Sequence, residues 1–362
     1  MDNFLKRKKI VYYIDNIQSL PISKPLVDES SGVIIVRSRR IYDLVKKQAP
    51  HTPIYIYSKW LGRFSRANKE LSCAHAIIIN RSGSIKIVKR FHRPIVMLFH
   101  GTFRDIGTRN IDSLAGTSLV LVNGPRQAKS FERFRDRLPL RCEQIGYIPF
   151  DKFITKTPQT SEEIKRKLGL NPQQKTVVYL PARKKVGSWS EHALKIANDI
   201  GDNINLIMRP HPNQLTEKTL VKELQSLFKK RKNHLLDIGD YHYNELLCIA
   251  DVLISDATSP AEESLYYDTP QIFTESFTRE EWRQTYEEDG LHPEDIKKLL
   301  MIYDTGISYL KNHYKDWGVC VKDALEKKNN FYKQRQNYFD YAFGDIKKGI
   351  AKRAVEIIYS SI

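Results

Sequence analysis

The stretch from Asp251 to Phe273 constrains the fold of this chain more than any other part of its sequence. It begins with the short apolar run Val252–Ile254, which is typical of a strand buried on both faces. Small polar residues follow, and the pattern of a helix start comes next, with Ser259 as the N-cap and Pro260 at the first helical position. Another apolar run, Gln271–Phe273, closes the stretch. A strand, a tight turn, a helix and a second strand predict a parallel sheet.

The turn of this stretch carries three hydroxyl side chains, those of Ser255, Thr258 and Ser259. The unpaired N–H groups of a helix start point toward the same place, and such a site favours an anion, most often a phosphate. Simple capping of the helix would explain Ser259 equally well. Two other polar segments, His100-Gly101-Thr102 and Arg209-Pro210-His211-Pro212, also follow apolar runs, and they favour the phosphate site.

Strand-like and helix-permissive stretches alternate through both halves of the chain. Short apolar runs rich in Val, Ile and Tyr lie at 10–14, 33–36, 54–57, 76–79, 95–99, 119–122, 144–149, 176–180, 204–208, 235–238, 252–254 and 271–273. This alternation is typical of mostly parallel sheets with helices on their faces. A chain of 362 residues exceeds what one compact core usually holds, so we expect two such domains.

A polar, threonine-rich segment, Asp151–Ser161, divides the two series of strands and is predicted to be the linker. We expect an N-terminal domain at residues 1–155, a second domain at 156–322 and closing C-terminal helices at 323–362. The fold class is then α/β, with two doubly wound domains that face a central cleft. Ligands of such sheets bind beyond the carboxyl ends of the strands, so the three polar segments are expected to converge there.

The positive charge of the chain is concentrated in its first half. The formal net charge is +17, and residues 1–155 hold 28 Lys and Arg against 12 Asp and Glu, a net of +16. The remaining residues hold 31 and 30, a net of +1. This asymmetry predicts that the first half faces a polyanion: a nucleic acid, an anionic membrane or a phosphate-rich polymer.

Targeting and cysteine signals are weak. No apolar run approaches the about 20 residues of a membrane helix, and the basic start of the chain is not followed by the apolar region of a signal peptide, so we expect a cytoplasmic protein. The four cysteines lie far apart, without a Cys-x-x-Cys or His/Cys cluster. Neither a disulfide framework nor a zinc site is expected.

Four side chains are candidates for chemistry. His100 directly follows the apolar run 95–99, and at the end of such a strand a neutral imidazole could take a proton from an attacking hydroxyl. His211 lies between two prolines and, with Arg209, offers two donors for a phosphate or a leaving group. Glu263, about one turn into the helix, could hold ribose hydroxyls, and a solvated helix residue has the same spacing.

Fingerprints of cofactors and metals are absent from the sequence. There is no Walker motif, no Gly-x-Gly-x-x-Gly and no Asp-x-Asp pair. We therefore expect no cofactor and no metal, so protein donors would have to neutralise the phosphates of a donor substrate.

The motifs, in this order, resemble the CDP-glycerol glycerophosphotransferase family of teichoic-acid primases, polymerases and related capsule enzymes. The similarity runs from about Ile95 to Phe273 and rests on His-Gly-Thr after a strand, Arg-Pro-His-Pro, Ser-Asp-x-Thr-Ser and the later Pro-x-Ile-Phe. Tyr179–Arg183 is similar to a Tyr-Ala-Pro-Thr-x-Arg segment of the family. The chain departs from the family pattern at Phe103-Arg104-Asp105, where Pro-Leu-Lys is usual, and at Ala182, which replaces a threonine.

The resemblance implies a GT-B fold of two Rossmann-like domains, with the acceptor domain first and the nucleotide-donor domain second. It implies roles for individual residues: His100 as the base, His211 at the pyrophosphate, and Ser255, Thr258 and Ser259 at the donor phosphates. We also expect Arg209 at the donor phosphates and Arg183 and Glu263 at the nucleotide. The expected reaction transfers glycerol phosphate, or a related polyol phosphate, from a CDP-activated donor to a hydroxyl of a cell-surface polymer or its lipid-linked precursor, with release of CMP.

The expected partners are a CDP-polyol donor, an anionic polymer or lipid-linked acceptor, and an anionic membrane surface to which the protein binds peripherally. A GT-B glycosyltransferase of capsule or lipopolysaccharide synthesis, using a nucleotide sugar, is the alternative. A basic nucleic-acid-binding protein is a further alternative, although the sequence carries no recognised nucleic-acid motif. The departures at 103–105 and 182 leave the donor and the acceptor open.

Overall fold

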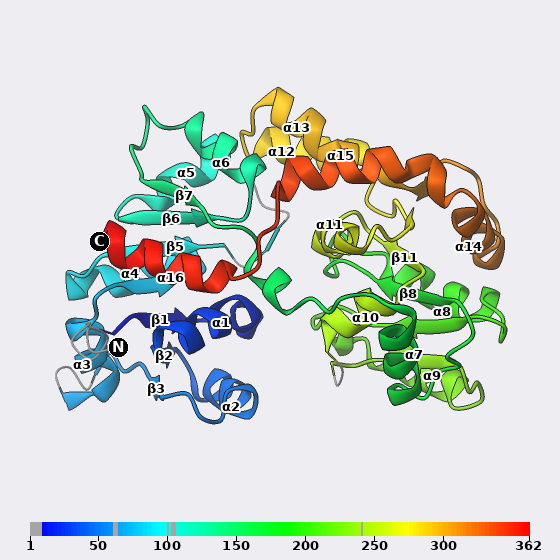
Figure 1. Ribbon diagram of the computed structural model, residues 1–362, viewed down its shortest axis with the longest axis horizontal. Helices are drawn as coiled ribbons and strands as arrows, with labels where there is room; N and C mark the ends of the chain where they lie inside the picture. Colours follow the sequence, from blue (N-terminus) through cyan, green and yellow to red (C-terminus); the bar gives the residue numbers. More distant parts are fainter. Residues whose placement is uncertain (1–8, 61–63, 100, 103–105, 240–241) are drawn as a thin grey trace. The chain divides into compact units, whose positions relative to one another are not determined.

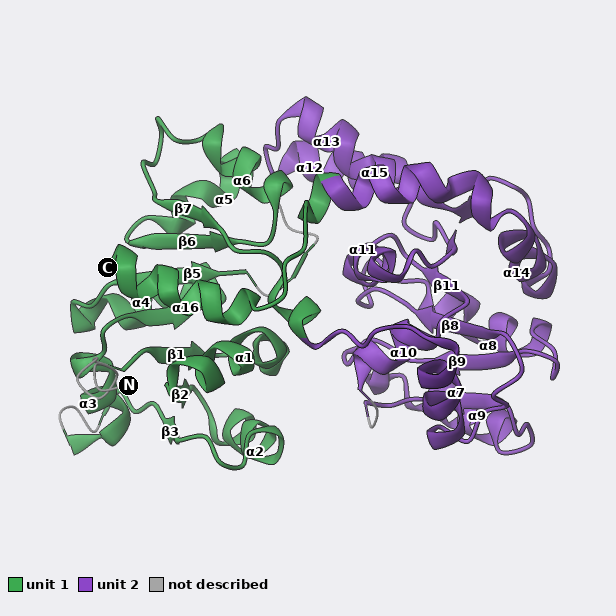
Figure 2. Ribbon diagram, viewed as in Figure 1, with its two compact units in different colours: residues 1–151, 341–362 green, residues 152–340 purple. Residues whose placement is uncertain are grey.

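The computed structural model describes residues 9–60, 64–99, 101–102, 106–239 and 242–362 (Figure 1). The chain forms two compact units (Figure 2). Unit 1 comprises Met1–Asp151 and Tyr341–Ile362, and unit 2 comprises Lys152–Asp340. In the part of the chain that the structure describes, no helix is both long enough and apolar enough to cross a bilayer.

Unit 1 is built on a parallel sheet with the strand order β3-β2-β1-β4-β5-β6-β7. Its strands are β1 (Val11–Ile14), β2 (Val33–Val36), β3 (Ile54–Ile56), β4 (Ile77–Ile79), β5 (Ile95–Leu98), β6 (Leu119–Val122) and β7 (Cys142–Gln144). Its helices are α1 (Leu20–Ser30), α2 (Arg39–Gln48), α3 (Arg66–Cys73), α4 (Ile85–Val88), α5 (Thr108–Ile111), α6 (Pro125–Glu132) and α16 (Ile350–Ser361). The central strands are short apolar runs buried along their whole length, as a sheet covered on both faces requires.

The start of the C-terminal helix α16 is bound by one carboxylate of unit 1. Asp151 accepts hydrogen bonds from the N–H groups of Gly349 (2.8 Å), Ile350 (3.0 Å) and Ala351 (2.9 Å). These N–H groups have no acceptor within the helix, and a negative charge at a helix start is stabilising. The helix packs beside α1, so the end of the chain returns to the unit in which it began.

Unit 2 repeats the architecture, with the strand order β10-β9-β8-β11-β12-β13 and parallel pairing throughout. Its strands are β8 (Thr176–Leu180), β9 (Asn205–Met208), β10 (His234–Leu236), β11 (Val252–Ser255), β12 (Gln271–Phe273) and β13 (Ile307–Ser308). Its helices are α7 (Pro158–Lys167), α8 (Trp189–Asp199), α9 (Lys218–Phe228), α10 (Tyr243–Ile249), α11 (Ser259–Ser264), α12 (Arg279–Glu288), α13 (Pro293–Leu299), α14 (Trp317–Glu326) and α15 (Tyr332–Phe343), the last of which continues into unit 1.

The predicted alternation of strands and helices is confirmed, but two local predictions at the end of unit 1 were wrong. The expected strand at 144–149 is instead the end of β7 followed by a 3-10 turn at Ile148–Lys152, because Gly146 adopts φ +98° and Pro149 has no N–H for a ladder. The expected linker Asp151–Ser161 contains the start of α7, where Thr157 and Thr160 form a capping box.

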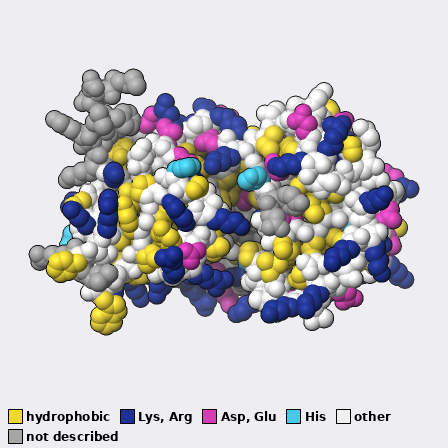
Figure 3. All heavy atoms as spheres, turned by 90° about the horizontal axis from the view of Figure 1, so that it is seen from below, with side chains coloured by type: hydrophobic (Ala, Val, Ile, Leu, Met, Phe, Trp, Pro, Cys, Tyr) yellow, Lys and Arg dark blue, Asp and Glu magenta, His cyan; other side chains and the backbone are white. Residues whose placement is uncertain are grey.

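The surface carries many cationic side chains. On the face shown in Figure 3, Lys and Arg side chains are more numerous than Asp and Glu and lie among hydrophobic side chains.

Candidate functional site

The candidate site lies at the C-terminal edge of the sheet of unit 2, where the strand order reverses between β8 and β11. In open parallel sheets this switch point is where ligands bind, because the loops leave the sheet in opposite directions. The segments that follow four neighbouring strands meet at this edge: 181–188 after β8, 209–214 after β9, 237–239 after β10 and 256–259 after β11.

A buried carboxylate, that of Asp256, joins the turn after β11 to the loop after β8. It accepts hydrogen bonds from the N–H groups of Ala182 (2.6 Å) and Ser188 (3.1 Å) and from the hydroxyl of Thr274. The next residue, Ala257, has φ +53°, a left-handed conformation that costs energy for a residue with a side chain. Backbone strain of this kind is concentrated at functional sites.

The loops after β8 and β9 are joined by amide side chains. Buried Gln214 accepts from the N–H of His211 (2.8 Å) and donates to the carbonyl of Ala182 (2.8 Å). Asn213 accepts from the N–H of Lys184 (3.3 Å). The two loops therefore hold each other in one arrangement before any ligand binds, which is the preorganisation that electrostatic catalysis requires.

Arg209, at the end of β9, is oriented by an anion and a ring. Its Nη1 lies 3.0 Å from Oδ2 of the fully buried Asp237, and its Cζ lies 5.7 Å from the ring centroid of Tyr243. The hydroxyl of Tyr243 forms a hydrogen bond with Glu263, and burial, reinforced by that carboxylate, raises the pKa of Tyr243 well above its usual value. Arg209 and Glu263, both predicted site residues, therefore belong to one network that connects β9, α10 and α11.

His211 and Arg183 also lie near each other. Burial lowers the pKa of His211, and the positive charge of Arg183 lowers it further, while a hydrogen bond with Asn213 opposes the shift. The ring Nδ1 lies 2.8 Å from Oδ1 of Asn213, which fixes the orientation of the imidazole. His211 is half-buried and Arg183 is exposed, so both can meet a ligand from solution.

The turn after β11 differs in detail from the prediction. Thr258, not Ser259, is the N-cap of α11, and its side chain makes no capping hydrogen bond. The carboxylate of Glu262, in the first turn of α11, accepts a hydrogen bond from the hydroxyl of Tyr338 (2.8 Å). The hydroxyl of Ser255 is buried and has no hydrogen-bond partner among the described residues, whereas Thr258 and Ser259 are half-buried.

The predicted base, His100, lies outside the described residues. Its neighbour Thr102 is buried, and the Thr102 carbonyl accepts a hydrogen bond from Arg126. Within the described ranges, no group of three or more His, Cys, Asp or Glu side chains is arranged to hold a metal ion.

The sequence alone did not identify Asp256, Gln214, Asp237 or Tyr243 as parts of the site. Asp256 stands inside the Ser-Asp-x-Thr-Ser motif, so its position was visible, but its role in holding the loop after β8 was not. Taken together, the edge offers a guanidinium, an imidazole and hydroxyls on a rigid set of loops, which is the equipment for binding phosphates.

Comparison with known proteins agrees with this chemistry. A sequence model described as CDP-Glycerol:Poly(glycerophosphate) glycerophosphotransferase matches residues 61–288, well over half of the chain and all of the loops described above. The chain belongs to this family.

Two relatives of this glycerophosphotransferase family member are teichoic acid ribitol-phosphate polymerases of Staphylococcus aureus. TarL is 22% identical over 209 residues, which is 51% of this chain and 36% of TarL. TarK is 20% identical over 240 residues, which is 59% of this chain and 45% of TarK. The matches thus span less than half the length of either relative.

Solved structures confirm the fold class. The wall teichoic acid polymerase TagF superposes with a TM-score of 0.64 at 15% identity, covering 99% of this chain and 90% of the TagF chain. HepE of Anabaena, in complex with UDP-glucose, superposes with a TM-score of 0.58 at 14% identity, covering 98% of this chain and 100% of HepE. This glycerophosphotransferase family member therefore has the predicted GT-B type of fold, with two Rossmann-like α/β units.

Proposed function

We propose that this protein transfers glycerol phosphate, or a related polyol phosphate such as ribitol phosphate, from a CDP-activated donor to a hydroxyl of a cell-surface polymer or its lipid-linked precursor. The observation that carries the proposal is the family match over residues 61–288, which includes the loops after β8, β9 and β11. Two observations support a polyol donor: the family description refers to CDP-glycerol, and the relatives TarL and TarK are ribitol-phosphate polymerases.

In the proposed reaction the acceptor oxygen attacks the phosphorus that carries the polyol. The bond from this phosphorus to the CMP oxygen breaks, and CMP leaves with the electron pair. His100 is proposed to take the acceptor proton, because a neutral imidazole is a base near neutral pH.

The loops of unit 2 are proposed to neutralise the donor diphosphate. Arg209 offers a planar fork of donors and is held in place by Asp237 and Tyr243. His211 and the hydroxyls of Ser255, Thr258 and Ser259 are proposed to add further donors, because charge that develops on a leaving group is best stabilised by groups already in place.

Arg183 and Glu263 are proposed to contact the nucleotide. Arg183 is exposed on the loop after β8, where it can reach a ligand at the switch point. Glu263 is buried beside Tyr243, and a carboxylate with two oxygens can accept from that hydroxyl and from a ribose hydroxyl together.

The experiment incubates the full chain with CDP-glycerol, CDP-ribitol or UDP-glucose and a polyol-phosphate acceptor, and it measures both the nucleotide released and the group attached. The expected result is CMP together with a polyol phosphate on the acceptor. Release of UDP with transfer of glucose would establish the glycosyltransferase alternative, and no turnover of any donor would contradict both. His100→Ala is expected to abolish transfer while the affinity for the donor stays nearly unchanged, because the base acts on the acceptor.

We further propose that the protein binds peripherally to anionic membranes through its basic first half. Each basic residue near such a surface contributes about 1 kcal/mol at most, and salt screens the attraction. Co-sedimentation with anionic vesicles at low salt, lost at high salt and absent with neutral vesicles, is the expected result. Failure to bind anionic vesicles at low salt would contradict this proposal and leave the acceptor polymer as the target of the charge.

A further inference from the structure

A second group of polar side chains lies in unit 1, around the C-terminal ends of β1, β2 and β3. The strand order of unit 1 reverses between β1 and β4, so this edge is the ligand-binding edge of its sheet as well. The group consists of Tyr13 in β1, Arg37 after β2, Tyr57 after β3 and Arg90 in the 3-10 turn Lys89–Phe91. We call these four residues the β1–β3 cluster.

The β1–β3 cluster is organised by ring contacts. The rings of Tyr13 and Tyr57 meet edge to face, with 6.0 Å between their centroids. Cζ of Arg90 lies 5.1 Å from the centroid of Tyr57 and 4.9 Å from that of Phe91. Arginine held against aromatic faces keeps its N–H fork available for an oxyanion.

A buried hydroxyl without a partner lies within the cluster. Tyr13 is 1% exposed, and its hydroxyl has no hydrogen-bond partner among the described residues. A buried polar group that stays unpaired costs free energy, and such groups in native proteins are often completed by a ligand, an ion or water.

The positive charge at the cluster is not offset by ion pairs. Arg37 directly follows Val36, which pairs with Ile14, the residue after Tyr13, and Arg90 lies against the ring of Tyr57, which contacts that of Tyr13. Burial raises the pKa of Tyr13 to about 12, and the positive charges of Arg37 and Arg90 oppose that rise. Asp15 acts in the opposite direction, and its carboxylate accepts a hydrogen bond from Ser84 (2.9 Å). Neither Arg37 nor Arg90 forms an ion pair with a carboxylate in the described part of the chain.

Other basic side chains of unit 1 are already engaged. Arg137 pairs with Asp112 at 2.5 Å and Arg141 pairs with Glu143 at 3.0 Å. The basic segment 86–93 therefore keeps a cation, that of Arg90, beside an unpartnered donor, whereas the basic segment 133–141 has part of its charge neutralised.

We propose that Arg37, Arg90 and the hydroxyl of Tyr13 form a binding site for a phosphodiester anion of the acceptor chain. The site deepens the proposed function and rests on it, because a polyol-phosphate acceptor carries one phosphodiester in each unit. The two guanidinium groups bind the phosphate oxygens, and Tyr13 donates its unpaired hydroxyl to the same anion.

The experiment measures binding of a fluorescein-labelled, lipid-free chain of glycerol phosphate units to the full protein by anisotropy. The variants are the double change Arg37→Gln/Arg90→Gln and, separately, Tyr13→Phe. The control is Lys129→Gln/Arg135→Gln, which removes the same charge from two exposed residues of unit 1 outside the cluster. Thermal unfolding of each variant checks that it folds, and CDP-glycerol affinity is measured in parallel.

Loss of Arg37 and Arg90 is expected to weaken binding by about tenfold or more, because two charge-assisted hydrogen bonds are removed, and Tyr13→Phe by about threefold. The control double variant is expected to bind within about twofold of the parent, since only long-range charge is lost. CDP-glycerol affinity is expected to stay unchanged in all variants.

Equal weakening in the control variant, or unchanged binding without Arg37 and Arg90, would overturn the site. If the double variant loses binding only to anionic vesicles and keeps the soluble chain, the cluster binds lipid headgroups and the inference is wrong. If the parent turns over no CDP-polyol but its binding of the chain still depends on Arg37 and Arg90, the proposed function fails and the anion site stands.

Discussion

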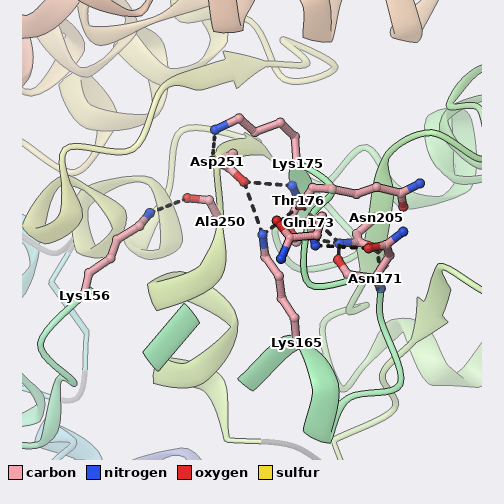
Figure 4. A network of polar contacts seen from close by, with 10 residues as sticks. Lys156, Lys165, Asn171, Gln173, Lys175, Thr176, Asn205, Ala250 and Asp251 are labelled. Atoms are coloured by element: carbon pink, nitrogen blue, oxygen red, sulfur yellow. Dashed lines mark hydrogen bonds and ion pairs between the residues drawn. The ribbon is translucent and has the colours of Figure 1, made fainter. Parts of the chain in front are cut away.

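The two edges of the sheet of unit 2 carry polar networks that differ in how many of their groups are left without a partner in the protein. At the N-terminal edge, Asp251 accepts from the N–H of Thr176 (2.9 Å) and from Lys175 (2.9 Å), and Lys156 donates to the carbonyl of Ala250 (2.8 Å) (Figure 4). Lys165 donates to the carbonyl of Gln174 (2.7 Å). Burial lowers the pKa of Lys156 and of Lys165, and both amines donate hydrogen bonds to backbone carbonyls of the protein.

The C-terminal edge also ties its loops together, but it keeps groups that point to a ligand. Asp256 and Gln214 fix the loops, while Arg183 stays exposed, His211 stays half-exposed and the hydroxyl of Ser255 has no partner in the described residues. A buried charged side chain is therefore not sufficient to identify a ligand-binding site in this fold. A network in which every polar group is hydrogen-bonded within the protein stabilises the sheet. A network that fixes its loops but leaves hydrogen-bond donors accessible to a ligand is the better candidate for a functional site.

The largest expected difference between the edges comes from removing one carboxylate at each. Asp256→Ala leaves two N–H groups and a hydroxyl without their acceptor in a buried site, so the free energy of unfolding should fall by about 3 kcal/mol and CDP-polyol binding should be lost. Asp251→Ala should cost about 1–2 kcal/mol, because its site is partly exposed, and should leave donor affinity unchanged. Denaturant unfolding and calorimetry check both. Equal effects of the two variants on donor affinity would remove the distinction between the edges.

A glycine in the loop after β8 gives the next largest effect. A Cβ on Gly187 would lie 2.2 Å from the carbonyl oxygen of Ala182, so Gly187→Ala forces the backbone apart and should cost about 2 kcal/mol together with donor affinity. Gly83→Ala is the matched control, since a Cβ there meets no atom within 4 Å. The melting temperatures of the two variants and their affinities for CDP-glycerol provide the test, and a Gly187→Ala protein that binds the donor normally would mean that the loop is not part of the site.

Arg209→Lys keeps the charge and removes the planar fork. Donor affinity should fall by about tenfold, because a compact ammonium cannot bind Asp237 and a phosphate with the same geometry. Lys175→Gln, at the other edge, is the control and should change affinity by less than about twofold. An Arg209→Lys protein with unaltered affinity would show that the guanidinium only pairs with Asp237.

The smallest effect concerns a proton on His211. Burial and Arg183 hold the pKa of His211 below its usual value of about 6.5, so the imidazole is neutral at pH 7. A bound diphosphate favours the protonated form, so donor binding should take up part of a proton and should tighten as the pH falls below 7. Calorimetry in buffers of different ionisation enthalpy measures the uptake, and its persistence in His211→Gln would assign the proton to another group.

Much of the fold followed from the sequence because its strands are short, mostly apolar runs rich in Val, Ile and Leu that lie between polar segments. The predicted ranges 33–36, 119–122, 176–180 and 271–273 match β2, β6, β8 and β12. The strand β13 was not predicted, since two residues carry too little pattern. The predicted N-cap of α11 was wrong by one residue because Thr258 and Ser259 are both suitable capping residues. The left-handed backbone conformation of Ala257 determines that Thr258 takes this position.

The sequence predicted which loops form the candidate site, but not the side chains that hold these loops together. Arg183, Arg209, His211 and Ser255–Ser259 all lie at one edge because parallel strands bring their carboxyl ends together. The residues that hold these loops were missed, because their partners are far away in the chain: Asp256 binds the N–H of a residue 74 positions earlier, and Gln214 a carbonyl 32 positions earlier. Such pairs depend on strand order and loop geometry, which hydrophobic periodicity does not encode.

Hydrogen–deuterium exchange with and without saturating CDP-glycerol tests the central claim most directly, that the donor binds at the C-terminal edge of unit 2. The account predicts slower exchange in peptides that cover 181–188, 209–214 and 255–260, and unchanged exchange at 171–176 and 250–252 on the other edge. Protection confined to the N-terminal edge or to unit 1, with none in the loops after β8, β9 and β11, would contradict it.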